Sequence, residues 1–585
     1  MVQQLSWKVG GQQGEGIEST GEIFSTALNR LGYYLYGYRH FSSRIKGGHT
    51  NNKIRVSTTQ VRSVSDDLDI LVAFDQETID VNVHELRVGG VVIADAKFNP
   101  SLPETCTTAT LYAVPFTEIA TELGTSLMKN MVAVGASSAV LHIGTEVFEE
   151  VVLEIFGKKG QKVVQKNMEA IKKGADYIRE QLGEQLETMK LDPADGKKRM
   201  FMIGNDAIAL GALAGGARFM PAYPITPASE IMEYLIKKLP QFGGTVIQTE
   251  DEIAACTMAI GANYAGVRAL TASAGPGLSL MMESIGLAGI TEQPVVIIDT
   301  QRGGPSTGLP TKQEQSDLMA MIYGTHGEIP KIVMAPSTVE EAFYDTIEAF
   351  NLAEEYQCPV IMLTDLQLSL GKQSVEPLDY NRVEIRRGKL QQGELEELEE
   401  KQYYKRYRVT EDGVSPRVIP GMKHGIHHVT GVEHDETGKP SESPVNRDDQ
   451  MNKRLRKTKG IRFNTPIHVH SHEKESDILF VGFNSTRGVI EEAMERLEQD
   501  GIKVNHAHIR LIHPFPADEL LPYVQGAKKV VVVENNATGQ LANILKMNIA
   551  SHDKIQSVLK YDGNPFLPQE VYAKSKEMFV LNGNV

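Results

Sequence analysis

The sequence has 585 residues, of which 41% are hydrophobic and 23% are charged. These proportions are typical of a folded globular protein and exclude a disordered or collagen-like chain, and the length predicts three or four domains of roughly 150 residues. Acidic residues (75) outnumber basic ones (60), for a net charge of −15. This charge argues against a broad nucleic-acid-binding surface, so we expect no nucleic-acid partner.

The cysteines and the apolar segments indicate the cellular compartment in which the protein is expected. The three cysteines, Cys106, Cys256 and Cys358, lie far apart and form no CxxC pair. We therefore expect no metal site on this chain and a reducing, cytoplasmic location. The N-terminus lacks a basic stretch followed by an apolar one, which predicts no secretion signal. The best apolar run, 131–148, is rich in Gly and Ser and contains His142, so we expect no membrane span.

The first half of the chain predicts two α/β domains. Residues 1–190 alternate apolar β-like runs, such as 69–75 and 89–95, with amphipathic helical stretches. After a polar linker, residues 200–375 repeat this alternation, and several of their predicted strands end in polar or Gly-rich loops. Because parallel sheets bind ligands beyond the carboxyl ends of their strands, we look for chemistry in these loops.

The second half predicts a connector and a further α/β domain. Residues 376–465 pass from an acidic run to a basic run and then show little periodicity. We expect a long connector that has little core of its own and wraps other domains. Its histidine-rich part, 421–435, is interpreted as polar connector rather than as a zinc site, because no cysteine or HxxxH spacing supports the metal. Residues 474–585 return to α/β alternation.

Two glycine-containing motifs lie in the first domain. GGQQGEG at 10–16 follows a predicted strand and precedes a predicted helix, where glycines allow close approach of a phosphate. SSRIKGGH at 42–49 combines hydroxyl and basic side chains that suit an anion or a partner. A tight turn and a basic hairpin loop explain the two motifs equally well, so both alternatives stay open.

Three motifs follow predicted strands of the second domain. In YPITPASE (223–230), Thr226 suits either a helix cap or a substrate contact. In QTEDEIAACTMAIGA (248–262), an acidic cluster precedes a helix of small residues, which fits a solvated helix start or a buried proton-exchanging carboxylate. In TQRGGPSTGLPT (300–311), Arg302 lies at a strand end, where a guanidinium suits a carboxylate ligand.

Together these motifs resemble the fused alpha subunit of the 2-oxoacid:ferredoxin oxidoreductases, most closely the two-subunit 2-oxoglutarate type. YPITPASE is the most specific signature, and TASAGPG (271–277) and VVVVENNATGQL (530–541) follow in the expected order. The resemblance implies several doubly wound α/β domains. They are a gamma-type domain at 1–190, a thiamine-diphosphate pyrimidine-binding domain at 200–375, the connector at 376–465 and a transketolase C-terminal-like domain at 474–585.

The resemblance implies a coenzyme A-dependent oxidative decarboxylation of a 2-oxo acid, with 2-oxoglutarate giving succinyl-CoA and electrons passing to ferredoxin. Thiamine enzymes activate the cofactor with a glutamate nine residues before a glycine; Glu252 has this spacing to Gly261, whereas Glu250 does not. Glu252 is thus the expected catalytic and cofactor-binding residue. The family pattern further assigns the substrate to Thr226, Arg302 and Thr311, and the cofactor to Ser273 and Gly275.

The resemblance also implies a partner subunit. Thiamine enzymes hold the diphosphate and Mg²⁺ with a Gly-Asp-Gly motif, and no Asp-Gly pair of this chain follows a glycine. We therefore expect a beta subunit to supply the Mg²⁺ site and a [4Fe–4S] cluster in an αβ or α2β2 assembly. Two alternatives remain: the same reaction on pyruvate or branched-chain 2-oxo acids, and a non-catalytic nucleotide-binding or assembly subunit.

Overall fold

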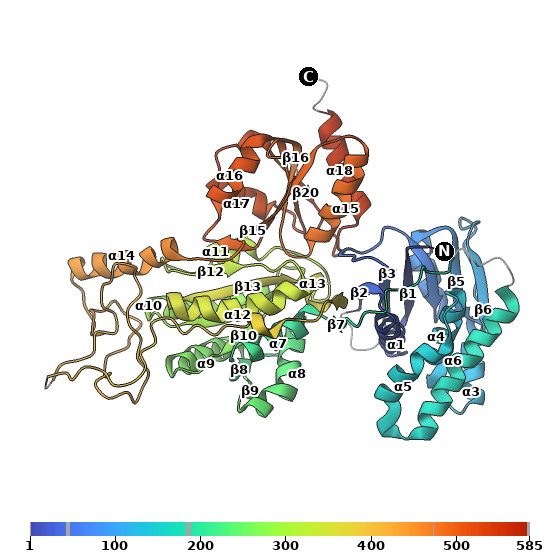
Figure 1. The fold of residues 1–585 in the computed structure, drawn as a ribbon, viewed down its shortest axis with the longest axis horizontal. Coiled ribbons are helices and arrows are strands. Elements are labelled where there is room, and N and C mark those ends of the chain that lie inside the picture. The colour runs from blue at the N-terminus through green and yellow to red at the C-terminus, as the bar shows by residue number, and fades with distance from the viewer. Residues whose placement is uncertain (1, 43–46, 183–188, 400, 472, 582–585) are drawn as a thin grey trace. The chain divides into compact units, whose positions relative to one another are not determined.

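The computed structural model describes residues 2–42, 47–182, 189–399, 401–471 and 473–581. The chain folds into two compact units, which we describe separately (Figure 1). No helix in these ranges is long and apolar enough to cross a membrane. The first unit comprises Met1–Met202, Leu370–Leu378 and Phe566–Glu570, and the second comprises Ile203–Ser369, Asp379–Pro565 and Val571–Val585.

The first unit is built on a mixed eight-stranded sheet. Four of its strands are parallel neighbours, and the other four are added antiparallel at one side, including one strand from the later segment Leu370–Leu378. In spatial order the strands are β6 (Thr110–Val114), β5 (Leu86–Asp95), β4 (Leu68–Ala73), β1 (Gln4–Gln12), β3 (His49–Ser57), β2 (Tyr34–His40), β14 (Gln373–Val375) and β7 (Met200–Met202).

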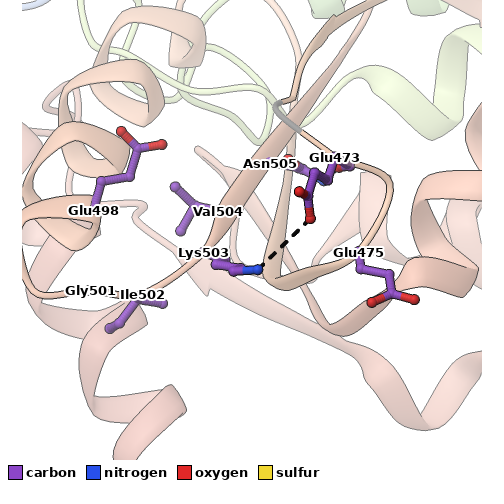
Figure 2. Close-up of a pocket in the computed structure, with 8 residues that line it drawn as sticks. All are labelled: Glu473, Glu475, Glu498, Gly501, Ile502, Lys503, Val504 and Asn505. Carbon is purple, nitrogen blue, oxygen red and sulfur yellow. Dashed lines mark hydrogen bonds and ion pairs between the residues drawn. The ribbon is translucent and has the colours of Figure 1, made fainter.

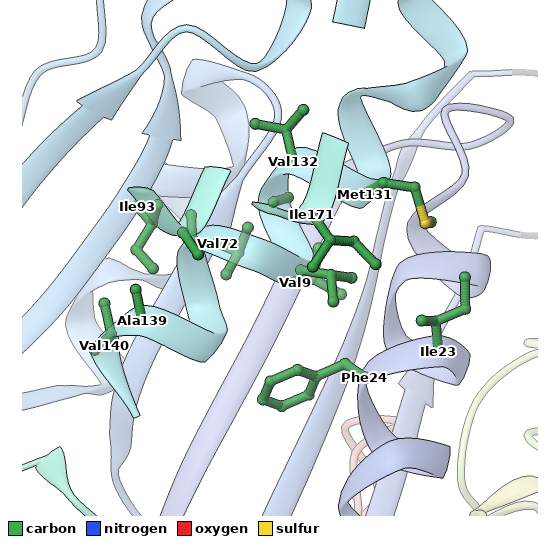
Figure 3. Packing of buried hydrophobic residues seen from close by; sticks show 14 of the residues in the cluster. Val9, Ile23, Phe24, Val72, Ile93, Met131, Val132, Ala139, Val140 and Ile171 are labelled. Carbon is green, nitrogen blue, oxygen red and sulfur yellow. The ribbon is translucent and has the colours of Figure 1, made fainter. Parts of the chain in front are cut away.

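Helices packed on this sheet form the core of the first unit (Figure 3). The Trp7 ring stacks on Phe24 with centroids 4.3 Å apart, and its indole N–H donates to the Ser137 hydroxyl at 3.0 Å. A Cβ added at Gly135 would lie 1.8 Å from the Ile171 carbonyl oxygen, so glycine permits the close helix contact. The helices are α1 (Ile17–Arg30), α2 (Gln76–Asn82), α3 (Phe116–Glu122), α4 (Lys129–Val140), α5 (Glu149–Phe156) and α6 (Gln161–Leu182).

The second unit begins with the sheet that carries the predicted site. Its central strand, β11 (Val295–Gln301), is buried along its whole length, as expected for a strand covered on both faces. The strands are β8 (Phe219–Ala222), β9 (Thr245–Gln248), β10 (Leu270–Ser273), β11, β13 (Pro359–Asp365), β12 (Ile332–Met334) and β18 (Leu511–His513), of which only β18 runs antiparallel among these described pairs.

Helices cover both faces of this sheet and connect its strands. The parallel pair of β8 and β9 is joined to the five-stranded sheet through an isolated bridge between Phe219 and Ala269. The carboxyl ends of β8 to β11 consequently lie along one edge, which is where the predicted site residues occur. The helices are α7 (Gly204–Ala214), α8 (Ser229–Lys238), α9 (Glu252–Tyr264), α10 (Gly275–Ile290), α11 (Leu318–Tyr323), α12 (Val339–Tyr356) and α13 (Leu366–Leu370).

The last part of the chain forms a five-stranded sheet, parallel except for its edge strand β15. Because β18 comes from this part of the chain and pairs with β12, the two sheets of the second unit are linked. The strands are β15 (Ile467–His470), β17 (Val504–Ile509), β16 (Ser476–Gly482), β19 (Ala527–Glu534) and β20 (Ile555–Leu559). The helices are α15 (Thr486–Gln499), α16 (Ala517–Gly526), α17 (Gln540–Asn548) and α18 (Pro568–Leu581).

The segment between the two sheets of the second unit is irregular up to helix α14 (Pro444–Gly460), which the sequence-based prediction missed. Lys453 and Lys457 of α14 are fully buried and form ion pairs with Glu292, which follows α10. Arg417 is likewise buried and pairs with Glu354 of α12 at 2.7 Å. The segment is therefore held to the α/β body by buried charges rather than by an apolar core.

Candidate active site

Glu252 lies at the start of α9, directly after strand β9. Of the three neighbouring acids, Asp251 caps the helix, because its side chain accepts a hydrogen bond from the Ala254 N–H at 2.8 Å. Glu250 is exposed, whereas Glu252 is only 6% exposed. The two hypotheses for this cluster thus apply to different residues: Asp251 serves the helix start, and Glu252 is the buried carboxylate.

The first turn of α10 packs against the Glu252 carboxylate. Ser273, the last residue of β10, donates from its hydroxyl to Glu252 Oε1 at 3.5 Å, the one hydrogen bond to this carboxylate among the described residues. A Cβ added at Gly277 would lie 2.0 Å from Ser273 Oγ and 2.7 Å from Glu252 Oε1. Glycine is therefore required at 277. The sequence analysis did not single out this position, although the TASAGPG motif contains it.

Arg302 and Thr226 meet at the same edge of the sheet. The Arg302 guanidinium donates from Nη1 to the Thr226 carbonyl oxygen at 2.5 Å, and its Nε has no partner among the described residues. Arg302 is 6% exposed, and burial lowers its pKa, an effect that the Asp317 carboxylate opposes. The prediction that Thr226 caps a helix is wrong, because α8 begins at Ser229. Thr226 contributes its backbone to the site.

Thr311 lies near Arg302 because the loop between them folds back on itself. The Gly303 N–H donates to the Lys312 carbonyl at 3.1 Å, and the Leu309 N–H donates to the Gly303 carbonyl at 2.8 Å. Thr311 is itself buried. Gly303 directly follows Arg302, and its bonding partner Lys312 directly follows Thr311. The bond between Gly303 and Lys312 therefore brings the backbone at Thr311 close to the backbone at Arg302. The loop therefore presents the two predicted substrate-binding residues from one closed turn.

Two further acids, Asp317 and Asp299, were not anticipated from the sequence. Asp317 precedes α11, and the Gly275 N–H at the start of α10 donates to its carboxylate. Burial and the neighbouring Glu314 raise the pKa of Asp317 to about 6, although Arg302 opposes this shift. Asp299 of β11 is fully buried, and burial together with Asp317 raises its pKa well above the usual range. The site thus contains the buried Arg302 guanidinium together with acids whose pKa values are raised by burial.

A cavity of about 340 Å³ lies elsewhere, in the last α/β layer (Figure 2). It opens at the amino ends of β16 and β17, and Lys503 forms an ion pair with Glu473 at 3.8 Å on its wall. Ligands of parallel sheets bind at the opposite, carboxyl ends of the strands. None of the predicted site residues lines this cavity, so we do not assign the chemistry to it.

The glycine motif of the first unit forms a tight turn between β1 and α1. Gly16 has a left-handed conformation (φ 84°), and a Cβ added there would lie 1.9 Å from Asn130 Nδ2. Glu15 forms an ion pair with Lys129 at 2.9 Å. Backbone geometry and packing therefore account for this glycine. In the second motif, residues 43–46 lie outside the described residues.

Family models match three consecutive parts of the chain. They are pyruvate ferredoxin/flavodoxin oxidoreductase at 6–177, the thiamine diphosphate-binding part of pyruvate flavodoxin/ferredoxin oxidoreductase at 210–453, and core domain II of pyruvate:ferredoxin oxidoreductase at 476–571. The subunit alpha of 2-oxoacid:ferredoxin oxidoreductase 2 from Aeropyrum pernix is 34% identical over 98% of this chain and 97% of its own length. The chain belongs to the 2-oxoacid:ferredoxin oxidoreductase alpha-subunit family.

Two other relatives of this alpha subunit are named for 2-oxoglutarate. The 2-oxoglutarate oxidoreductase subunit KorA of Mycobacterium tuberculosis is 32% identical, over 96% of this chain and 89% of its own. The solved 2-oxoglutarate:ferredoxin oxidoreductase from Magnetococcus marinus, with 2-oxoglutarate, coenzyme A and succinyl-CoA bound, aligns with 99% of this chain and all of that chain. The TM-score is 0.92 and the identity 36%. All predicted site residues of the alpha subunit lie in its thiamine diphosphate-binding part.

Proposed function

We propose that this alpha subunit contributes half of the active site of an enzyme that converts 2-oxoglutarate and coenzyme A to succinyl-CoA and carbon dioxide and passes the electrons to ferredoxin. The observation that carries the proposal is the buried Glu252 carboxylate beneath the glycine-containing turn of α10. The ligands in the solved relative from Magnetococcus marinus support 2-oxoglutarate as the substrate class.

The residues around Glu252 fit the aminopyrimidine ring of thiamine diphosphate. When bound, this cofactor supplies the nucleophilic carbon and the electron sink for decarboxylation. The carboxyl group of Glu252 would hold and exchange a proton with the ring, since Ser273 engages one of its oxygens only weakly, at 3.5 Å. Ser273 would orient this carboxyl group, and the first turn at Gly275 would contact the cofactor.

Arg302 and Thr311 are proposed to bind the substrate. The guanidinium is buried and anchored on one side by the Thr226 carbonyl, and its remaining N–H groups suit a carboxylate. A 2-oxoglutarate molecule carries two carboxylates, so an arginine at this position favours it over pyruvate if it holds the distal one. The Thr226 backbone would fix the guanidinium in place while the substrate is exchanged.

A partner beta subunit is proposed to complete the site with Mg²⁺, the diphosphate-binding residues and the [4Fe–4S] cluster. Large apolar side chains on α9 and α10 support this, because Ile253, Met258 and Leu280 are 47%, 36% and 52% exposed. An interface with a partner subunit would cover these side chains. We propose an αβ or α2β2 assembly in the cytoplasm.

The experiment uses the chain co-expressed with its partner subunit. Glu252→Gln keeps the size of the side chain but removes its acid function, and we expect turnover to fall by about 10²–10⁴-fold. Hydrogen–deuterium exchange at the thiazolium carbon of the bound cofactor should slow with it. Glu250→Gln is the matched control and should leave both rates near wild type, because Glu250 is exposed.

The outcomes separate the roles. Unchanged exchange in Glu252→Gln would show that Glu252 does not activate the cofactor. Slowed exchange in Glu250→Gln alone would show that Glu250, and not Glu252, has this role. A substrate screen of the same complex, comparing kcat/KM for 2-oxoglutarate, pyruvate and branched-chain 2-oxo acids, tests the substrate assignment. A preference for pyruvate would overturn it.

A further inference from the structure

The motif VVVVENNATGQL (530–541) forms the carboxyl end of β19 and the turn that leads into α17. The Glu534 carboxylate is fully buried and accepts hydrogen bonds from two N–H groups in the first turn of α17, at 2.7 and 3.1 Å. Asn536 Oδ1 accepts another from the Gly539 N–H at 2.8 Å. These bonds fix the shape of the turn, so its remaining polar groups are held in defined positions.

Gln315 is joined to this turn by three hydrogen bonds. Its N–H donates to the Asn535 carbonyl oxygen at 2.7 Å, and the Asn535 N–H donates to Gln315 Oε1 at 2.9 Å. The Asn536 side-chain amide donates from Nδ2 to the Gln315 carbonyl oxygen at 3.1 Å. Gln315 and both asparagines are buried. The backbone of Gln315 is therefore held by the residues that directly follow β19.

The same motif holds the residues that follow Gln315. Gln540 Nε2 donates to the Ser316 carbonyl oxygen at 2.7 Å, and Gln540 Oε1 accepts from the Met319 N–H, in the first turn of α11, at 2.9 Å. Gln540 is only partly buried, unlike Gln315. The motif thus contacts a continuous stretch of backbone that runs from Gln315 into α11.

The side-chain amide of Gln315 contacts two further strand ends. Its Nε2 donates to Asp365 Oδ2 at 2.8 Å and to the Phe483 carbonyl oxygen at 3.2 Å. Asp365 is the last residue of β13, and Phe483 directly follows β16. The backbone groups and both side-chain polar atoms of Gln315 therefore have partners, which come from both sheets of the second unit. A buried amide satisfied in this way holds one orientation, because any displacement leaves polar groups unpaired.

One hydrogen bond connects this anchored residue to the loop that carries Arg302 and Thr311. The Asp317 N–H, two residues after Gln315, donates to Gln301 Oε1 at 3.2 Å. Gln301 is fully buried and directly precedes Arg302. The bond closes the base of the loop. The position of Gln315 is consequently transmitted to the residue beside Arg302.

We propose that Gln315 is a positioning residue that keeps Arg302 in place for the substrate, and that the motif at 530–541 holds Gln315 for this purpose. The inference rests on the proposed substrate role of Arg302. Gln315 acts on the substrate through the loop, because its own polar groups are engaged by protein partners. The last α/β layer thereby takes part in substrate binding, although none of the predicted site residues lies in it.

The first test is Gln315→Met in the complex with the partner subunit. Methionine has a similar length but no amide, so the side-chain bonds of residue 315 are lost and its backbone bonds remain. With the 2-oxo acid that the wild type turns over fastest, we expect KM to rise between about 10- and 100-fold and kcat to change less. Hydrogen–deuterium exchange at the thiazolium carbon should stay at the wild-type rate, because Glu252 is not disturbed. A general loss of structure would slow this exchange as well.

Two more variants accompany this measurement. Gln293→Met is the matched control, since Gln293 is also buried, precedes the opposite end of β11, and donates from Nε2 to the Thr291 carbonyl oxygen at 3.1 Å. We expect it to keep the wild-type KM. Gln540→Met releases the residues after Gln315 from a partly exposed position and should also raise KM. It decides the question if Gln315→Met does not assemble.

A double variant tests whether Gln315 acts through Arg302. Arg302→Ala removes the group that Gln315 is proposed to hold, so adding Gln315→Met should lower kcat/KM little further. Multiplied losses in the double variant would overturn the inference and leave the proposed function intact. So would a wild-type KM in Gln315→Met, or in Gln540→Met where Gln315→Met does not assemble. Wild-type kcat/KM in Arg302→Ala for every 2-oxo acid would instead overturn the proposed substrate role, and with it the role of Gln315.

Discussion

A single methyl group added at Gly277 should disable the candidate active site. In Gly277→Ala the new Cβ would lie 2.0 Å from Ser273 Oγ and 2.7 Å from Glu252 Oε1, far inside ordinary contact distance. Ser273 and Glu252 are both buried, so neither side chain has open space to move into. Relief of the contact therefore requires displacement of the Glu252 carboxylate, of the turn of α10, or of both.

The magnitude follows from two opposing effects on stability and one on rate. Overpacking of this kind costs about 1–3 kcal/mol, while replacing glycine by alanine within a helix returns roughly 0.5–1 kcal/mol. The net loss of stability should thus be small, between about 0 and 2.5 kcal/mol. The loss of activity should be larger, because a displacement of about 1 Å in a reacting group costs on the order of 10²-fold in rate.

The assay compares turnover and the thermal unfolding midpoint of the assembled complex. Gly286→Ala is the matched control, since it makes the same change in the same helix and the nearest atom to its new Cβ is His326 Cε1 at 3.9 Å. We expect the control to keep wild-type turnover. If Gly277→Ala turned over 2-oxo acid as fast as Gly286→Ala, the argument that Gly277 shapes the Glu252 environment would be refuted.

Two further predictions concern buried charges. Arg302→Ala should lose about 1.5–3 kcal/mol of charge-assisted binding, or roughly 10- to 160-fold in kcat/KM, more for 2-oxoglutarate than for pyruvate; equal losses, or full activity in Arg302→Lys, would contradict a role in bidentate recognition of the distal carboxylate. Glu292→Ala leaves Lys453 and Lys457 buried without their partner, and by comparison with other buried pairs should reduce the free energy of unfolding by about 3–5 kcal/mol. Because these lysines hold the pKa of Glu292 below its ordinary value, its stabilising contribution is present above that ordinary value and is lost on acidification. Chemical denaturation measures this loss, and exposed Glu283→Ala should show none; equal stability of the two variants would show that the cluster contributes little.

Local sequence patterns were sufficient to predict several strands and the loops in which the site residues lie. Apolar runs at 69–75 and 89–95 predicted buried strands, and the structure has β4 and β5 there. Loops after the strands of the second domain predicted the edge at which Ser273 contacts Glu252 and Arg302 contacts Thr226. These features depend on residues close in the chain, since strand periodicity and strand–loop order are local properties.

The acidic cluster at 250–252 shows what local sequence patterns do not predict: which of several neighbouring acids is buried. Its members are equivalent in composition, and only the backbone geometry at the helix start makes Asp251 the cap and leaves Glu252 buried. The spacing to Gly261 selected Glu252 through the family resemblance, and its catalytic role stays a prediction. Thr226 likewise looked suited to capping, but the helix begins three residues later.

What the sequence by itself determined about this protein is its α/β class, its family and the stretches that carry the candidate site. Only the tertiary structure decided which charges are buried and against what. Lys453 and Lys457 belong to a polar stretch, yet they lie buried because Glu292, more than a hundred residues away, supplies the counter-charge. Asp299 and Asp317 are ordinary acids in sequence, and only their burial in the fold raises the pKa of each carboxyl group. Burial and electrostatic coupling depend on neighbours in space, and a linear pattern does not contain those neighbours.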